Sequence, residues 1–209
     1  MTANNIKIID YKAGNAPSVL HAVQRLGFHG ELVKEPEGLE DPGSIILPGV
    51  GSAGATMGSL RESGMIDALT RYVTNKKIPF LGVCVGMQIL FEYSEEEDAS
   101  CFGWLKGRVI KFDSSLVRVP QMGWNEVRFV NETPVGAKNG YFYFVNSYYA
   151  RPEDPDDTWG IGNYGEDFTA AVRRGNIYGT QFHIEKSGEE GLTLLKGFLT
   201  LAGQREAGE

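Results

Sequence analysis

Apolar and amphipathic segments alternate over the first hundred residues. Short apolar runs with polar, Gly or Pro borders predict buried strands, and apolar residues that recur every three to four positions predict helices between them. Strands are expected over residues 6–10, 31–35, 44–48 and 78–83, and helices over 15–27, 63–77 and 86–94. This alternation predicts a parallel sheet with helices on both faces.

The pattern changes after residue 100. Runs rich in β-branched and aromatic residues follow one another, separated by Gly, Pro, Asn and Asp, as in antiparallel strands. They cover residues 107–112, 125–130, 141–149, 168–175 and 176–185, and a final helix is expected over 188–202. The predicted fold class is therefore α/β with three layers: a mostly parallel central sheet, helices on both faces, and additional antiparallel strands in the second half. Residues 1–209 are expected to form one domain.

Charge and hydropathy narrow the class of protein. The net charge of −7 argues against a nucleic-acid surface, which needs clustered Lys and Arg. The N-terminus lacks the pattern of a signal peptide, and no apolar run approaches the roughly 18 residues that span a bilayer. We therefore expect a cytoplasmic protein. The acidic run at 95–98 is expected to be a solvated loop.

The cysteines and histidines limit the possible chemistry. Cys84 and Cys101 do not make a disulfide framework. His21, His29 and His183 are scattered, without the spacing of metal ligands. We therefore expect neither a metal nor a cofactor.

One cysteine lies in a distinctive setting, Gly82-Val83-Cys84-Val85-Gly86. The spacing is that of the G-x-S-x-G nucleophile elbow, with sulfur in place of oxygen. Such a sharp strand-to-helix turn tolerates only glycine nearby, and the helix N-terminus favours the thiolate. The N–H of Val85 is then free to donate to an oxyanion. The alternative is that Cys84 is a small buried side chain, so the presence of a base must decide.

His183 is the best candidate for that base. It lies near the end of the strand expected over 176–185, two residues before Glu185, and side chains two apart in a strand share a face. Glu185 can therefore orient the imidazole while His183 faces the thiol, as in a catalytic triad. Taken alone, a surface His-x-Glu pair on an edge strand would be the better interpretation. Together with the elbow, the pair predicts a triad.

A second glycine-rich stretch, GVGSAG at 49–54, matches the G-x-G-x-x-G fingerprint of dinucleotide-binding proteins. It follows the third expected strand instead of the first, and the next strand ends at Cys84 without an acidic residue to hold a ribose. We therefore expect this loop to expose backbone N–H groups that stabilise an anion. A non-catalytic nucleotide-binding module, with Cys84 merely buried, is the alternative.

Taken together, these motifs resemble a known family. GVCVGMQ, followed by TQFHIEKS, is similar to the class I (triad) glutamine amidotransferases. Within the family, DYKAGN, LPGVGSAG, PQMGWNEV and FVNSYYA resemble the branch that forms the glutaminase subunits of imidazole glycerol phosphate synthases, and the resemblance covers nearly the whole chain. It implies that Cys84 attacks the side-chain amide of glutamine and that His183, oriented by Glu185, transfers protons. Ammonia leaves, and a γ-glutamyl thioester is hydrolysed to glutamate.

The resemblance also implies roles for residues around the triad. The N–H groups of Val85 and of the loop at Val50 and Gly51 would form the oxyanion hole. The residues that would hold the glutamine substrate are Gly49, Gly51, Gln88, Ser147 and Tyr148. The positions that depart from the family pattern are Lys12 in place of a glycine, Asn146 in place of a histidine and Ile184 in place of a proline.

Finally, the resemblance implies a partner. The sequence has no P-loop or basic groove for a phosphorylated acceptor, so ammonia would be used by a cyclase subunit of (β/α)8-barrel type in a heterodimer. The products would be imidazole glycerol phosphate and an aminoimidazole carboxamide ribotide, in histidine biosynthesis. The positions expected at that interface are Asn15, Gln121, Met122, Gly123, Trp124, Asn125 and Lys186. The alternative is a glutaminase that serves pyridoxal phosphate, anthranilate or aminodeoxychorismate synthesis.

Overall fold

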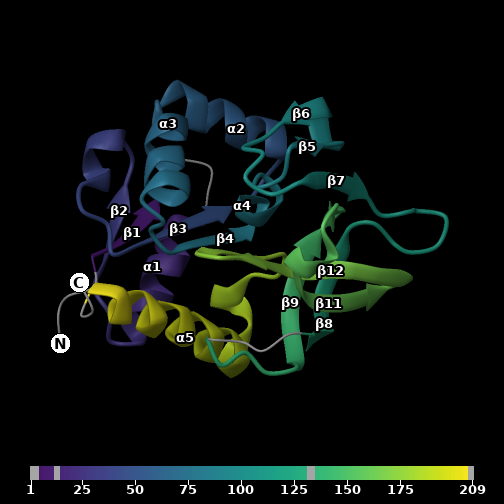
Figure 1. The fold of residues 1–209 in the computed structure, drawn as a ribbon. Helices are drawn as coiled ribbons and strands as arrows, with labels where there is room; N and C mark the ends of the chain where they lie inside the picture. The colour runs from purple at the N-terminus through teal and green to yellow at the C-terminus, as the bar shows by residue number, and fades with distance from the viewer. Residues whose placement is uncertain (1–4, 12–14, 131–134, 207–209) are drawn as a thin grey trace.

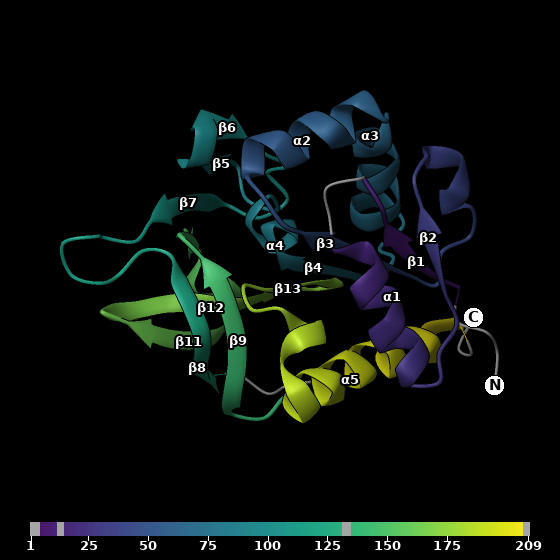
Figure 2. The same cartoon turned by 180° about the vertical axis from the view of Figure 1, so that it is seen from behind.

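The computed structural model describes residues 5–11, 15–130 and 135–206. Within them, one mixed sheet runs through the molecule and helices cover both of its faces (Figure 1). The helices of one face are α1 (Ala16–Arg25) and α5 (Gly188–Glu206), and those of the other are α2 (Ala53–Glu62) and α3 (Met65–Thr70). The view from behind shows the same two helix layers, one on each side of the sheet (Figure 2). The predicted three-layer α/β fold is confirmed.

The parallel part of the sheet is built mostly from the first half of the chain. In spatial order its strands are β2 (Gly30–Val33), β1 (Ile6–Ile9), β3 (Ser44–Gly49), β4 (Phe80–Cys84) and β13 (Ile177–Thr180). Every residue of β1, β3, β4 and β13 is buried, as expected for parallel strands covered on both faces. The four strands expected in the first half are therefore present.

The second half of the chain extends this sheet with mainly antiparallel strands. Beyond β13 the order continues with β12 (Glu166–Arg174), β10 (Tyr148–Pro152), β7 (Gly107–Lys111), β5 (Tyr93–Ser94) and β6 (Ala99–Ser100). A branch from β12 consists of β11 (Thr158–Tyr164), β8 (Gln121–Phe129) and β9 (Gly140–Asn146). Apart from the short parallel pair β5–β7, these pairings are antiparallel, as predicted.

Helix boundaries on the α2–α3 face differ from the prediction. The sequence analysis did not foresee α2, whose N-terminus is capped by the Ser52 side chain, which accepts a hydrogen bond from the N–H of Ala55 (3.2 Å). Ser63, expected at the start of a helix, instead ends α2. The next helix begins after Gly64, which has a φ of 70°.

Other predicted elements are shorter than expected. The helix expected over 86–94 is a single turn, α4 (Val85–Gln88), and the chain then enters β5. The strand expected over 141–149 is interrupted at Ser147, between β9 and β10. The strand expected over 176–185 ends at Thr180. β11 was not foreseen at all.

Strand β13, the last in the chain, lies in the middle of the sheet between β4 and β12. Its register with β4 pairs Gly179 with Gly82 and Thr180 with Val83. Because the two strands are parallel, the segments that follow them leave the sheet at the same edge. This brings residues after Thr180 next to residues after Val83, about a hundred positions earlier in the sequence.

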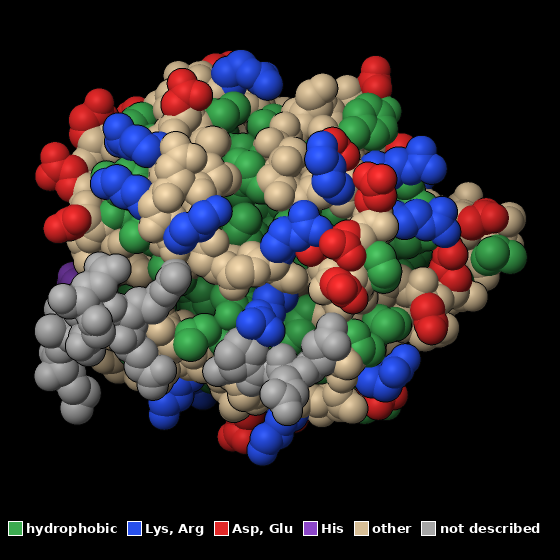
Figure 3. All heavy atoms as spheres, in the orientation of Figure 1, with side chains coloured by type: hydrophobic (Ala, Val, Ile, Leu, Met, Phe, Trp, Pro, Cys, Tyr) green, Lys and Arg blue, Asp and Glu red, His purple; other side chains and the backbone are tan. Residues whose placement is uncertain are grey.

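Basic and acidic side chains are interspersed on the face drawn in Figure 3, and neither sign dominates it. Within the described part of the chain, no helix combines the length and apolar character needed to cross a bilayer. The same residues contain no group of three or more His, Cys, Asp or Glu side chains placed to bind a metal ion.

Candidate active site

The turn that carries Cys84 has the strained geometry of a nucleophile elbow. Cys84 has a φ of 54° and a ψ of −110°, a combination that non-glycine residues rarely adopt. A Cβ added to Gly82 would collide with the backbone of Gly86, and one added to Gly86 would collide with the carbonyl oxygen of Leu47. A Cβ on Gly49 would lie 2.6 Å from the backbone nitrogen of Gly86. The expectation that only glycine fits around this turn is therefore confirmed.

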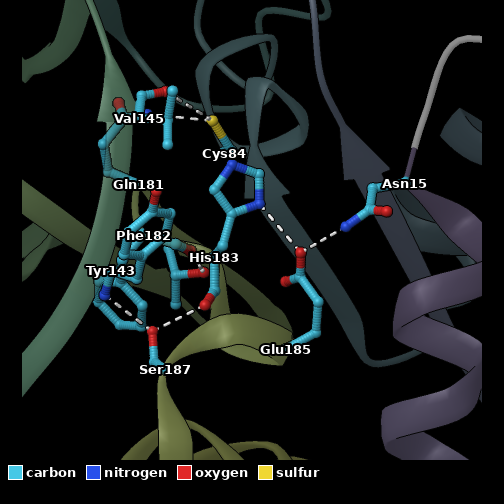
Figure 4. A network of polar contacts seen from close by, with 10 residues as sticks. Asn15, Cys84, Tyr143, Val145, Gln181, Phe182, His183, Glu185 and Ser187 are labelled. Carbon is cyan, nitrogen blue, oxygen red and sulfur yellow. Dashed lines mark hydrogen bonds and ion pairs between the residues drawn. The ribbon is translucent and has the colours of Figure 1, made fainter. Parts of the chain in front are cut away.

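The predicted triad residues lie together. The imidazole of His183 lies between the Cys84 sulfur and the Glu185 carboxylate (Figure 4). Nδ1 of His183 is 3.0 Å from Oε1 of Glu185, and both side chains are almost completely buried. Asn15 also donates from Nδ2 to Oε1 of Glu185, at 2.7 Å. The carboxylate is thus held from two sides.

The reasoning that paired His183 with Glu185 was wrong about the backbone. His183 lies beyond the end of β13, and Glu185 is in the short 3₁₀ turn η5 (Ile184–Lys186). It is this turn, instead of the alternation of a strand, that places Glu185 beside the imidazole. Ile184, which replaces the family's proline, is buried in the core.

Strand β9 fixes the loop that carries the base. The N–H of His183 donates to the carbonyl oxygen of Tyr143 (2.9 Å). The Ser187 hydroxyl donates to the carbonyl oxygen of His183 (2.7 Å) and accepts from the N–H of Tyr143 (3.0 Å). Figure 4 shows this second set of contacts below the triad. The imidazole therefore extends from a backbone that is hydrogen bonded on both sides.

The electrostatics of the triad favour a protonated imidazole. Burial by itself lowers the pKa of His183, but its hydrogen bonds with Cys84 and Glu185 outweigh burial and raise that pKa to about 10. For Glu185, burial raises the pKa of the carboxyl group. Pairing with His183 and the hydrogen bond from Asn15 outweigh burial, and the pKa of Glu185 lies below its ordinary value. A charged imidazole between a sulfur and a carboxylate is the arrangement that an ion pair with a thiolate requires.

A cavity of about 270 Å³ opens in front of Cys84. Its lining residues are Val50, Gly51, Cys84, Val85, Gln88, Glu96, Pro120, Val145, Asn146, Ser147, Tyr148 and His183. Most of the residues expected to touch substrate or oxyanion line this cavity. Two residues expected in the site, Gly49 and Glu185, do not line it. Gly49 pairs with Cys84 across β3 and β4, and Glu185 lies behind His183.

The acidic run at 95–98 was expected to be a solvated loop; Glu95, Glu97 and Asp98 are exposed, but Glu96 is half-buried. Glu96 lines the cavity, and its Oε2 accepts from the N–H of Ala53 at 2.9 Å. Glu97 accepts from the Ser52 hydroxyl at 2.7 Å and from the N–H of Ala55 at 3.2 Å. Burial raises the pKa of Glu96, although the bond from Ala53 opposes this. Sequence reasoning had no local signal for these contacts, since the partners are about forty residues apart.

Buried amides form the floor of the site. Gln88 is buried, and its Nε2 donates to the carbonyl oxygen of Tyr148 (3.0 Å) and to Oε1 of Gln181 (3.0 Å). Asn146 donates to the same Tyr148 oxygen at 2.9 Å. The departure from histidine at this position thus places an amide on the β9–β10 junction. Gln181 was not singled out from the sequence.

The residues expected at a partner interface are only partly exposed. Met122 and Trp124 are 67% and 55% exposed, and Lys186 is exposed as well. Gln121 is buried, Gly123 is half-buried, and the half-buried Asn125 donates to the carbonyl oxygen of Asn163. Asn15 is half-buried against Glu185, and Lys12 lies outside the described residues.

Comparisons with known proteins agree with this geometry. The family model described as "Glutamine amidotransferase class-I" matches residues 7–201. The chain is 48% identical to the imidazole glycerol phosphate synthase subunit HisH of Leptospira borgpetersenii, over 94% of this chain and 100% of the relative. It is 40% identical to the chloroplastic imidazole glycerol phosphate synthase hisHF of Arabidopsis thaliana, over 93% of this chain and 34% of that protein.

Among solved structures, a crystal structure of a glutamine amidotransferase superposes with a TM-score of 0.77 at 22% identity, covering 95% of this chain and 98% of the other. At that identity, the likeness establishes the fold. The family match spans nearly the whole chain, and relatives more than 40% identical cover it almost completely. The chain therefore belongs to the class I glutamine amidotransferase family.

Proposed function

We propose that this protein is the glutaminase subunit of an imidazole glycerol phosphate synthase. It hydrolyses L-glutamine to glutamate and ammonia through Cys84, His183 and Glu185. One observation carries the chemistry: a cysteine on a strained elbow shares a cavity with a histidine whose imidazole is held by a buried carboxylate. The sequence relationship to HisH proteins supports the assignment to this synthase.

The reaction follows from the arrangement of these groups. The Cys84 thiolate attacks the carbon of the substrate's side-chain amide, and the carbonyl oxygen becomes an oxyanion. The N–H of Val85 and those of the loop at Val50 and Gly51 stabilise that charge. His183 then gives its proton to the departing nitrogen, which leaves as ammonia. Water, deprotonated by His183, attacks the γ-glutamyl thioester, and glutamate is released.

The cavity suits a free amino acid. Its volume of about 270 Å³ accommodates a small molecule instead of a protein chain. Glu96 places a carboxylate at the wall, where it can accept hydrogen bonds from an α-ammonium group. The main chain at Ser147 and Tyr148 lies on the other side, where it can bind the rest of the substrate. Gln88 can hydrogen bond to the side-chain amide of glutamine.

The ammonia is proposed to pass to a partner, a cyclase of (β/α)8-barrel type that forms a heterodimer with this chain. The Leptospira relative is named a subunit, and the Arabidopsis relative extends far beyond the region that this chain matches. Exposed Met122, Trp124 and Lys186 are candidates for the contact surface. A cytoplasmic location stays a prediction. Glutaminases of the other three pathways and a nucleotide-binding module are less well supported, because relatives at 44–48% identity are named HisH.

Covalent labelling with an electrophilic glutamine analogue, mapped by peptide mass spectrometry, tests the proposal. Label on Cys84 that glutamine blocks and that is lost in His183→Ala is the expected result. Cys101→Ser is the matched control and should be labelled like the wild type. Adding the cyclase with its bound ligand should increase the labelling rate. Absence of label, or equal labelling of Cys84 and Cys101, would overturn the assignment of the nucleophile.

A further inference from the structure

Gln181 is a buried polar residue that the mechanism above does not use. It directly follows β13, and since Thr180 pairs with Val83 of β4, its position corresponds to that of Cys84 on the neighbouring strand. Its side chain is completely buried, and Nε2 lies 3.7 Å from the Cys84 sulfur. The amide therefore contacts the reacting atom from inside the protein.

The orientation of this amide is fixed by a chain of hydrogen bonds that starts at the backbone. The carbonyl oxygen of Tyr148 can only accept, so Gln88 must turn its NH₂ group toward it. The same NH₂ group meets the side chain of Gln181, which must therefore present its oxygen. The remaining end of the Gln181 amide, its NH₂ group, is left facing the sulfur. The sequence of donors and acceptors allows no other arrangement of these two amides.

We propose that Gln181 is a catalytic residue that stabilises the Cys84 thiolate by donating an N–H to its sulfur. This rests on the proposed function, in which Cys84 is the nucleophile. A hydrogen bond to a charged acceptor is about twice as strong as one between neutral groups, so the donor favours the thiolate over the thiol. The sulfur that faces the protonated His183 is thereby held in the charged form that attacks the substrate.

A second contact of the sulfur acts against the thiolate. The carbonyl oxygen of Val145 lies 3.9 Å from Sγ of Cys84. A carbonyl oxygen can accept from a neutral S–H but repels a thiolate, so this contact favours the protonated sulfur. The N–H of Gln181 offsets that repulsion. Gln88, which lines the cavity, keeps the donor aligned, so the floor of the substrate pocket and the charge on the nucleophile are coupled.

The rate of Cys84 alkylation by iodoacetamide as a function of pH tests the proposal. Gln181→Met keeps the length of the side chain but removes the donor. We expect the pH profile of Cys84 alkylation to move to higher pH by about one unit, so that the rate on the rising part of the profile falls roughly tenfold. An unchanged pH profile in folded Gln181→Met would overturn the proposal.

Asn176→Ala is the matched control. Asn176 is an amide at the opposite end of β13, and its Nδ2 donates to the carbonyl oxygens of Val73 and Ile78. Its loss should lower stability without shifting the alkylation profile. A shift as large as that of Gln181→Met would show that weakened folding alone moves the profile, and would also refute the proposal.

A measurement on the wild type covers the case in which the variants do not fold. The side-chain ¹H–¹⁵N resonances of Gln181 should titrate with the same pKa as Cys84 alkylation, and should be insensitive to that ionisation if no hydrogen bond exists. The failures of the two proposals are distinguishable. If iodoacetamide does not prefer Cys84 over Cys101 in the wild type, the nucleophile assignment fails. If it does, and Gln181 has no effect, only the role of Gln181 fails.

Discussion

The two cysteines of this protein differ in burial and in chemistry, since Cys84 is buried and Cys101 is half-buried. Cys84 has a strained backbone, a histidine beside it and an amide donor behind it. Cys101 follows the short strand β6, and its sulfur contacts the carbonyl oxygen of Ala99 at 3.5 Å. Burial raises the pKa of the Cys101 thiol to about 11. Desolvation thus disfavours the Cys101 thiolate, whereas a histidine and an amide donor lie beside the Cys84 sulfur.

The largest expected effect is the difference in glutaminase turnover between variants of the two cysteines. Cys84→Ser should lower glutaminase turnover by about 10⁴-fold or more, because the weaker nucleophile is not matched to this site. Cys101→Ser should retain turnover within about twofold. Ammonia release under saturating glutamine, with the liganded cyclase present, measures both. Comparable losses in the two variants would show that the contrast between the sites is not a catalytic one.

A smaller effect concerns the glycine that lies two residues after each cysteine. In Gly86→Ala the new methyl group collides with the backbone of Leu47, so we expect a loss of about 3 kcal/mol of unfolding free energy. Gly103 has a φ of 66°, but its nearest neighbour would lie 3.7 Å from the new atom. Gly103→Ala should therefore cost only about 1 kcal/mol, from backbone strain. Urea unfolding measures the loss of unfolding free energy in both variants. Equal losses would contradict the close packing of the elbow.

A third effect is a pH dependence of stability. The pKa of folded His183 is raised to about 10 from an ordinary 6.5, so its stabilising contribution is complete below 6.5 and declines as pH rises toward 10. The advantage of the wild type over His183→Gln in unfolding free energy should shrink over that range. Cys101, raised from 9.0 to about 11, contributes a decline only above pH 9. Cys101→Ser should therefore leave the pH dependence of the unfolding free energy between pH 7 and 9 unchanged. A changed slope would show that Cys101, and not His183 alone, causes the decline.

The alternation of apolar runs and helical periods was enough to predict the parallel strands, because each is short, buried and bounded by turns. It did not reveal α2, whose ten residues include two glycines and show little amphipathic pattern. That helix depends on Ser52 and on contacts with Glu96 and Glu97, which only the folded chain brings near. β11, with two glycines among its seven residues, was missed for a similar lack of pattern.

In the site too, residues marked by local sequence patterns were predicted, and residues placed by distant contacts were not. Spacing and chemistry singled out Cys84 and His183, and the family resemblance pointed to the segment at Ser147 and Tyr148. Nothing local marks Gln181 or Glu96, since each reaches the site through pairing with residues far away in the sequence. The link between His183 and Glu185 was predicted for the wrong backbone, because periodicity does not reveal where a strand ends.

The central position of β13 has a consequence for the protein during its synthesis. The ribosome completes Cys84 about a hundred residues before His183, an interval of about 5–20 s at ordinary elongation rates. Throughout that time the nucleophile has neither its base nor the carboxylate that orients it. The gap between β4 and β12 also stays open until β13 is inserted. Because His183 and Glu185 both follow β13 in the chain, the triad cannot assemble before the strand that fills the middle of the sheet has been synthesised.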